Sequence, residues 1–148
     1  DLYADFLEAE RLSKLPKQQR ADAATWIERL YTADPQLAER AARWLGQNGG
    51  EGAVEPLRDA LTHKDGGVRA AAALALGAVR RRAPVRDLCE RLLHDGNSMV
   101  REAAAQALGQ IGDRAGIECL EVAVRGDTKS KVRKAATASL AQIRARRG

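Results

Sequence analysis

Residues suited to chemistry are few, because the 148-residue chain holds only two histidines and two cysteines. Zinc and iron sites need several His, Cys, Asp or Glu ligands in a close cluster. Cys89 and Cys119 have no other Cys or His at metal-ligand spacing. His63 and His94 each close a segment with helical periodicity, where the helix dipole favours a cation. We therefore expect no metal site and no cofactor.

Support for nucleophilic chemistry is equally small. Both cysteines stand among apolar residues of expected helices, so we interpret them as small buried side chains in a reducing compartment. A disulfide would require stacked helices to come closer than their usual separation of about 8–10 Å. Nothing places a nucleophile beside a base, and the glycine-rich stretch 46–52 lacks the Lys-Ser/Thr of a phosphate loop. We expect no catalytic residue.

Composition indicates a helical protein with a basic end. All five aromatic residues fall in the first third, so the rest must pack with Leu, Val, Ile and Ala, which favours helices. Residues 99–148 hold ten Lys and Arg against five Asp and Glu. Such an end favours acidic partners, nucleic acid included, although a solvated surface is the plainer interpretation. No apolar run could cross a bilayer and no leader is visible, so we expect a cytoplasmic protein without membrane contact.

The elements that would position any site come from a repeated phrase. VREAAAQALGQIGD at 100–113 has variants at 37–50, 68–81 and 132–145. The apolar residues that open the four phrases are separated by 31, 32 and 32 positions. An aspartate precedes each phrase, and another apolar segment precedes each aspartate. Self-similarity at a period near thirty residues predicts a stack of repeated structural units.

Each repeat predicts two helices. The second helix of the third repeat carries apolar residues at helical spacing on one face, where alanines allow close helix packing: Val100, Ala103, Ala104, Ala107, Leu108 and Ile111. We expect one all-α domain over 1–148, with repeats at about 17–49, 50–81, 82–112 and 113–147. Residues 1–15 stand outside the repeat pattern, and we expect them to form a capping helix over the open apolar end.

The consensus D-x(2–4)-V-R-x-A-A-x-x-A-L-G-x-I-G resembles the HEAT-like repeat of the phycobilin-lyase type, from about residue 17 onward. The resemblance implies a right-handed α-solenoid of about four helical hairpins. In that family the arginine after the valine pairs with aspartates of the repeat loops in a ladder along the stack. The residues that would take these structural roles here are Arg69, Arg101 and Arg133 with Asp65, Asp95 and Asp127.

The resemblance also bears on activity. Some HEAT-like repeat enzymes are di-iron hydroxylases, which carry His-Glu directly after the Val-Arg pair. This chain has Ala70-Ala71, Glu102-Ala103 and Lys134-Ala135 at those positions. We therefore predict that the protein is not an enzyme. A bilin lyase or chaperone-like subunit remains an alternative, although no residue here specifies a bilin.

The favoured function is a protein–protein interaction scaffold that binds a helix or an extended peptide on its concave face. Residues off the packing face of the second helices supply the candidate contacts: Leu74, Gln106, Gln110, Lys134 and Gln142. Arg80, Arg81 and Arg82 form a basic edge where the consensus has a glycine. The concave face has no basic stripe, so a nucleic-acid partner is disfavoured. The last repeat could also stack on a further domain or on a second copy.

Overall fold

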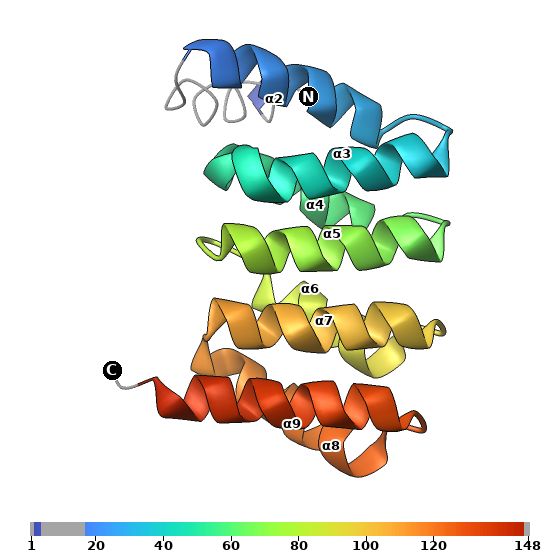
Figure 1. The fold of residues 1–148 in the computed structure, drawn as a ribbon, viewed down its shortest axis with the longest axis vertical. Coiled ribbons are helices and arrows are strands. Elements are labelled where there is room, and N and C mark those ends of the chain that lie inside the picture. The colour runs from blue at the N-terminus through green and yellow to red at the C-terminus, as the bar shows by residue number, and fades with distance from the viewer. Residues whose placement is uncertain (1, 4–16, 147–148) are drawn as a thin grey trace.

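The computed structural model describes residues 2–3 and 17–146, without the side chains of residues 17–21, and this part of the chain contains no strand (Figure 1). The all-α fold class is therefore confirmed, whereas the expected capping helix over 1–15 lies almost wholly outside the described residues. Short 3-10 turns, Gly50–Ala53 and Arg114–Gly116, precede two of the helices. The helices are α2 (Lys17–Leu30), α3 (Pro35–Asn48), α4 (Val54–Ala60), α5 (Gly66–Val79), α6 (Val85–His94), α7 (Ser98–Ile111), α8 (Ile117–Gly126) and α9 (Ser130–Ala145).

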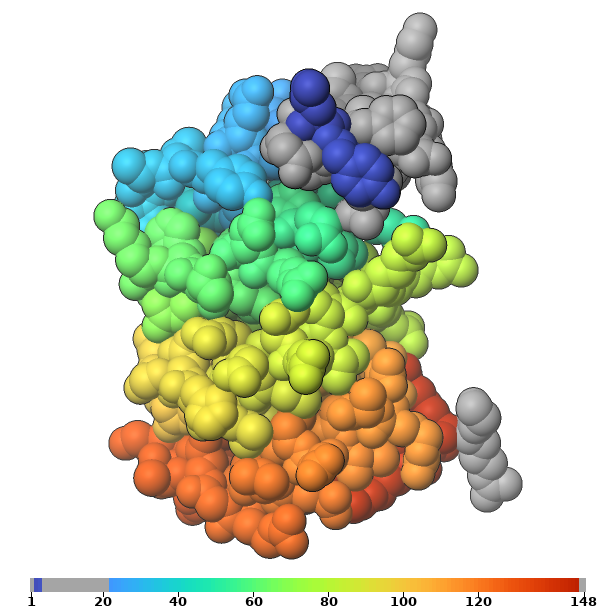
Figure 2. Space-filling model, turned by 180° about the vertical axis from the view of Figure 1, so that it is seen from behind, coloured from blue at the N-terminus to red at the C-terminus, as the bar shows by residue number. Residues whose placement is uncertain are grey.

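The helices form a two-layered solenoid. α3, α5, α7 and α9 lie side by side in one layer, which we call the groove layer (Figure 1). α4, α6 and α8 form the outer layer, and they follow one another down the opposite face (Figure 2). α2 packs on α3 at the N-terminal end of the stack. Each hairpin therefore contributes one helix to each layer, apart from the α2–α3 pair.

Short polar turns begin the groove-layer helices. Asp34, Asp65 and Asn97 each cap a helix by accepting a backbone N–H, at 3.0 Å, 3.1 Å and 2.9 Å. Gly112 ends α7 with a positive φ of 76°, a conformation that glycine adopts without strain. Arg80 takes the equivalent place after α5 with φ of 64°, where a side chain is disfavoured.

Small residues bring the groove-layer helices close together. A Cβ atom added at Gly46 would lie 2.7 Å from the Cα of Ala75, and one at Gly77 would lie 2.8 Å from the Cα of Ala107. Each glycine is therefore required by a neighbouring backbone rather than by its own φ. Gly109 is close to α9 in a similar way, but through side-chain atoms, because a Cβ added there would lie 2.8 Å from the Cβ of Ser139. Glycines at this period thus set the distance between successive repeats.

A disulfide links Cys89 of α6 to Cys119 of α8 in the outer layer. The expectation of two reduced, separately buried cysteines was therefore wrong. Their Cα atoms are 5.7 Å apart, although helix axes usually lie about 8–10 Å apart. Each Cα stands about 2.3 Å from its own axis, so residues facing each other across two neighbouring helices can meet the geometry of a disulfide. The axis separation of packed helices is therefore no obstacle to a disulfide between them.

Candidate functional site

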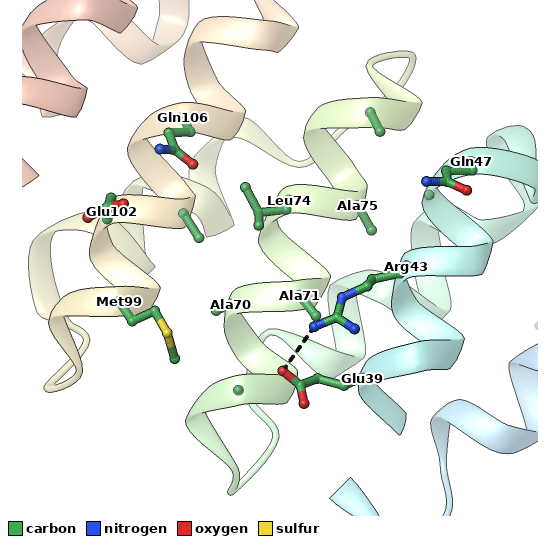
Figure 3. A pocket seen from close by; sticks show the side chains of 14 residues that line it. Glu39, Arg43, Gln47, Ala70, Ala71, Leu74, Ala75, Met99, Glu102 and Gln106 are labelled. Carbon is green, nitrogen blue, oxygen red and sulfur yellow. Dashed lines mark ion pairs between the residues drawn. The ribbon is translucent and has the colours of Figure 1, made fainter. Parts of the chain in front are cut away.

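A shallow hollow lies on the exposed side of the groove layer, where α3, α5 and α7 run side by side (Figure 3). Its volume is about 290 Å³. Glycine and alanine make up half of its lining, and their short side chains leave the space above the helices open. The lining residues are Glu39, Arg43, Gly46, Gln47, Gly67, Ala70, Ala71, Leu74, Ala75, Ala78, Met99, Glu102, Ala103 and Gln106.

Two large apolar side chains are exposed in the hollow. Leu74 is 42% exposed and Met99 is 49% exposed, and Leu74 points from α5 toward α7 (Figure 3). Glu39 and Arg43 form an ion pair on α3, with Oε1 and Nη2 3.6 Å apart. Glu102 adds a second carboxylate from α7. The hollow therefore combines an apolar floor with two carboxylates and one guanidinium, an excess of negative charge.

The structure brings two of the five predicted contact residues, Leu74 and Gln106, into this hollow. Gln110 and Gln142 are exposed on the same layer, and each places its amide oxygen over a glycine of the preceding helix. Lys134 lines a separate hollow on α9. A role of these five residues in binding a partner stays a prediction. Met99 was missed, because it opens its helix outside the repeated phrase.

The basic edge lies on the turn between α5 and α6, away from the hollow. Arg81 places Nη1 3.6 Å from Oε1 of Glu51, and Arg82 places Nε 3.6 Å from Oε2 of the same carboxylate. Arg80 is exposed at the end of α5. One carboxylate thus faces two of the three arginines, and the positive charge of this edge is partly compensated.

Two arginines of the groove layer each reach the aspartate of the next hairpin. Arg69 donates from Nε to Oδ2 of Asp95 at 2.9 Å and from Nη2 to Oδ1 at 3.1 Å. Arg101 donates to Asp127 in the same way, at 2.9 Å and 3.4 Å. The Nη1 atoms bind backbone carbonyls of the preceding turns, those of His63 and Asp95. These two-pronged contacts form an Arg–Asp ladder across hairpins.

Asp65 takes a different place from the one that the resemblance implied. It caps α5 through the N–H of Val68, and no arginine forms an ion pair with it among the described residues. The position equivalent to Asp95 in that turn belongs to His63, whose Nδ1 accepts the N–H of Asp65 at 3.0 Å. Asp95 likewise accepts the N–H of Asn97 at 2.9 Å. The ladder therefore begins at Arg69 and Asp95, not at Asp65.

Arg133 has part of the same arrangement. Its Nη1 donates to the backbone carbonyl of Asp127 at 2.6 Å, as Arg101 does to that of Asp95. No carboxylate of the described residues forms an ion pair with Arg133. The third ladder arginine therefore lacks the across-hairpin contact that Arg69 and Arg101 both make.

The ladder changes the acidity of its aspartates. Burial of the Asp95 carboxyl raises its pKa, but hydrogen bonds from Arg69 and from the N–H of Asn97, with the charges of Arg69 and Arg91, outweigh burial. The pKa of Asp95 therefore lies below its ordinary value. Burial also raises the pKa of Asp127, but hydrogen bonds from Arg101 and from the N–H of Lys129, with the charges of Arg101 and Arg133, outweigh it and lower that pKa. Both carboxylates are held in the charged form.

The repeating hairpins match a known type of repeat. Residues 23–95 and 85–147 match the family model described as HEAT repeats. The chain belongs to the HEAT-repeat family. The resemblance found in the sequence is thus confirmed, and the ladder and the glycine contacts are features of the junctions between its HEAT repeats.

Two solved structures are similar to these HEAT repeats. Human deoxyhypusine hydroxylase, in complex with glycerol, has a TM-score of 0.72 and 26% sequence identity over 82% of this chain and 43% of that chain. An engineered protein has a TM-score of 0.62 and 28% identity, over 82% of this chain and 62% of its own. The chain thus spans less than two-thirds of either protein. No curated protein matches the sequence.

The likeness to deoxyhypusine hydroxylase corrects the prediction that the protein is not an enzyme. An enzyme shares this HEAT-repeat arrangement at 26% identity over most of the chain. The prediction rested on the absence of a His-Glu pair after each Val-Arg pair. The lack of this one ligand pattern does not exclude enzymatic activity.

The histidines and acidic residues are dispersed over the stack. Among the residues that the structure describes, no three His, Cys, Asp or Glu side chains gather closely enough to hold a metal ion. His63 belongs to the turn before α5, and His94 is exposed at the end of α6. None of the helices described is long and apolar enough to cross a membrane.

Proposed function

We propose that the chain is a HEAT-repeat scaffold that binds a partner polypeptide in the hollow of α3, α5 and α7. The exposure of Leu74 and Met99 in one concave surface, on the neighbouring helices α5 and α7, carries the proposal. A concavity lined mostly by apolar side chains is typical of binding sites, whereas single exposed apolar residues elsewhere on a surface are ordinary. The hollow is open and crosses three helices, which suits a helix or an extended segment.

Charge specifies the partner further. Glu39 and Glu102 flank the apolar floor, and only Arg43 among the lining residues is basic. A partner that places a large apolar side chain against Leu74 and a lysine or arginine beside the carboxylates would complement both features. The chain as a whole carries a net charge of +5, whereas the charged residues that line the hollow, Glu39, Glu102 and Arg43, sum to −1. The proposed partner is therefore a basic segment with a bulky apolar residue.

A peptide selection tests this function even though the partner is unidentified. A random peptide library displayed on phage is selected on the immobilised 148-residue protein, and bound sequences are compared with those selected on variants. We expect sequences that combine Lys or Arg with Leu, Met, Phe or Trp. Leu74→Arg should eliminate them, because it places a long cation on the floor of the hollow.

The matched control is Val122→Arg on α8, which makes the same kind of change at a residue that is 46% exposed in the outer layer. It should leave the selected sequences unchanged. Glu102→Gln should weaken the selected peptides and reduce the salt dependence of their binding. Selection of acidic peptides, or identical selection on Leu74→Arg and wild type, would rule out the hollow as the binding site. Circular dichroism of each variant checks that the helices are intact.

A further inference from the structure

A second hollow lies on the outer layer, where α6 meets α8, on the layer that faces the viewer in Figure 2. Its volume is about 380 Å³, within the range of about 300–1,000 Å³ that small-molecule sites occupy. The Cys89–Cys119 disulfide forms part of its lining, and we call it the disulfide hollow. The other lining residues are Val85, Arg86, Leu93, Ala115, Glu118 and Val122.

The two cysteines of this disulfide differ in accessibility. Cys119 is only 6% exposed, whereas Cys89 is half-buried and keeps part of its surface toward the solvent. Thiol–disulfide exchange begins when a thiolate attacks one of the two sulfurs, and access helps to decide which one. We therefore expect an external thiolate to attack Sγ of Cys89, and Sγ of Cys119 to be the sulfur that departs.

The surroundings of Cys119 suit a departing sulfur. Cys119 is the third residue of α8, within the first turn, where the helix dipole favours negative charge. Its Sγ lies 3.4 Å from the carbonyl oxygen of Gly116, which can accept a hydrogen bond from the thiol once the sulfur is protonated. The chain therefore accommodates Cys119 while it departs and after it has gained a proton.

α6 and α8 have supports besides the disulfide. α6 packs on α7, and α8 packs on α9. Leu88 and Leu92 of α6 and Leu120 of α8 are buried in the hydrophobic core. The disulfide therefore adds to the stability of the outer layer without being its sole attachment, so exchange is compatible with the folded stack.

Two charged side chains of the disulfide hollow are available to a ligand. Arg86 of α6 and Glu118 of α8 are exposed, and neither forms an ion pair with another of the described residues. A small thiol peptide such as glutathione carries carboxylates and an ammonium group. Arg86 and Glu118 therefore complement both signs of charge on such a thiol.

We propose that the disulfide hollow is a site of thiol–disulfide exchange with a small charged thiol, and that Cys89 is the residue that carries the thiol. The thiolate attacks Sγ of Cys89, a new S–S bond forms, and the bond between Cys89 and Cys119 breaks. The electron pair of the broken bond leaves with Sγ of Cys119, which takes a proton from water. Attack of Cys119 on the mixed disulfide expels the small thiol and restores the original bond. This inference is independent of the hollow on α3, α5 and α7.

Two single-cysteine variants of the full chain test which sulfur reacts. Cys119→Ser leaves Cys89, Cys89→Ser leaves Cys119, and each is mixed with oxidised glutathione, which forms the same mixed disulfide by expelling one glutathione thiolate. Mass spectrometry of the intact protein follows the rate. We expect Cys119→Ser to gain glutathione at least about tenfold faster, because the fold shields Cys119. In concentrated urea the two rates should converge. Equal rates in the folded proteins, or a faster reaction of Cys119, would overturn the proposal.

A third variant tests the preference for a charged thiol. Arg86→Gln, added to Cys119→Ser, should slow the reaction with oxidised glutathione about two- to fivefold relative to uncharged hydroxyethyl disulfide, because one exposed ion pair is lost. The ratio corrects for any effect of the charge on the thiol of Cys89 itself. The control Arg125→Gln removes the same charge from an exposed position of α8 outside the hollow and should leave the ratio unchanged. An unchanged ratio in Arg86→Gln would contradict the assignment to a charged thiol.

The wild-type protein supplies a measurement that needs no substitution, and circular dichroism of each variant checks that the helices are intact. The protein is reduced with dithiothreitol, desalted and exposed briefly to a substoichiometric amount of iodoacetamide. Trypsin then places the two cysteines on separate peptides, 87–91 and 115–125. The label on 87–91 should exceed that on 115–125 at least about tenfold. Equal labelling of the two peptides would overturn the choice of Cys89.

Discussion

Replacing Asp95 by asparagine should destabilise the stack strongly for an isosteric change. The Asp95 side chain is 1% exposed and accepts two hydrogen bonds from Arg69, with Arg91 3.4 Å away. It also accepts the N–H of Asn97, which fixes the turn before α7. The amide retains the shape and the acceptor for Asn97 but removes the charge that Arg69 and Arg91 share. The change therefore isolates the electrostatic part of one ladder contact.

The structure sets the size of the effect. Breaking one side of a buried ion pair costs about 3–5 kcal/mol. The Arg69 side chain is 18% exposed and keeps the carbonyls of His63 and Lys64 as acceptors, which places the expected loss at the lower end, about 3 kcal/mol. A protein of this size changes its Tm by about 2–4 °C per kcal/mol. Asp95→Asn should therefore lower the Tm by about 6–12 °C.

Thermal unfolding followed by circular dichroism measures the loss, with Asp65→Asn as the control. Asp65 stands in the preceding turn and caps α5 without an arginine partner among the described residues. Asparagine caps helices about as well as aspartate, so Asp65→Asn should change the free energy of unfolding by less than about 0.5 kcal/mol. Equal losses for the two variants would show that the Arg–Asp contact adds nothing beyond the turn.

The effect should also depend on pH. The pKa of Asp95 is lowered in the folded protein, so between that pKa and the ordinary value the unfolded chain binds more protons. The stabilisation by Asp95 is therefore fully present above the ordinary pKa and is lost as the pH falls through the lowered one. The Tm difference between wild type and Asp95→Asn should be constant near neutral pH and shrink in acid. A difference that persists after Asp95 is protonated would refute the electrostatic explanation.

Three further changes test the packing and the backbone. Gly109→Ala should lower the free energy of unfolding, measured in urea, by about 1–3 kcal/mol, because the added methyl group meets side chains of α9. The control Gly126→Ala adds a methyl group in open space and should lower that free energy much less. Reduction of the Cys89–Cys119 disulfide, which spans 30 residues, should lower the free energy of unfolding by about 3.5 kcal/mol, and a Tm unaffected by reductant would contradict this. Arg80→Gly should raise stability by about 0.5–1 kcal/mol, because it relieves a positive φ, and a lower Tm would show that the arginine side chain outweighs the strain.

The sequence predicted the fold because the fold depends on a repeated pattern. Val68, Val100 and Val132 recur at a fixed period, and all three are fully buried. The glycines at 46, 77 and 109 follow the same period and meet the next helix. Periodic packing is visible in one sequence, since each repeat supplies an independent copy of the same constraint.

The turns were harder to predict, because they differ between repeats. Asp95 stands five residues before Val100, but Asp65 stands only three before Val68. The prediction accepted any aspartate ahead of the valine, and it therefore assigned the helix cap Asp65 to the ladder. Requiring a spacing of five residues before the valine would have excluded Asp65. Met99 was missed for a related reason, since it lies at a helix start where the repeat consensus specifies nothing. Contacts between elements that do not follow the repeat, such as the disulfide, leave no periodic signal.

The pairing of residue types at the junctions restricts how such a stack can change in evolution. The arginine-to-aspartate distance is 26 residues at both ladder junctions, so loss of the third repeat brings Arg69 opposite Asp127 and restores a matched junction. Loss of the second repeat instead brings Ala38 opposite Asp95, and the buried carboxylate loses its two-pronged contact with Arg69 and keeps only Arg91, 3.4 Å away. We therefore expect duplication or deletion of a repeat to destabilise the stack less within the ladder than at its N-terminal boundary, so the number of repeats should vary more freely on one side of Arg69 than on the other.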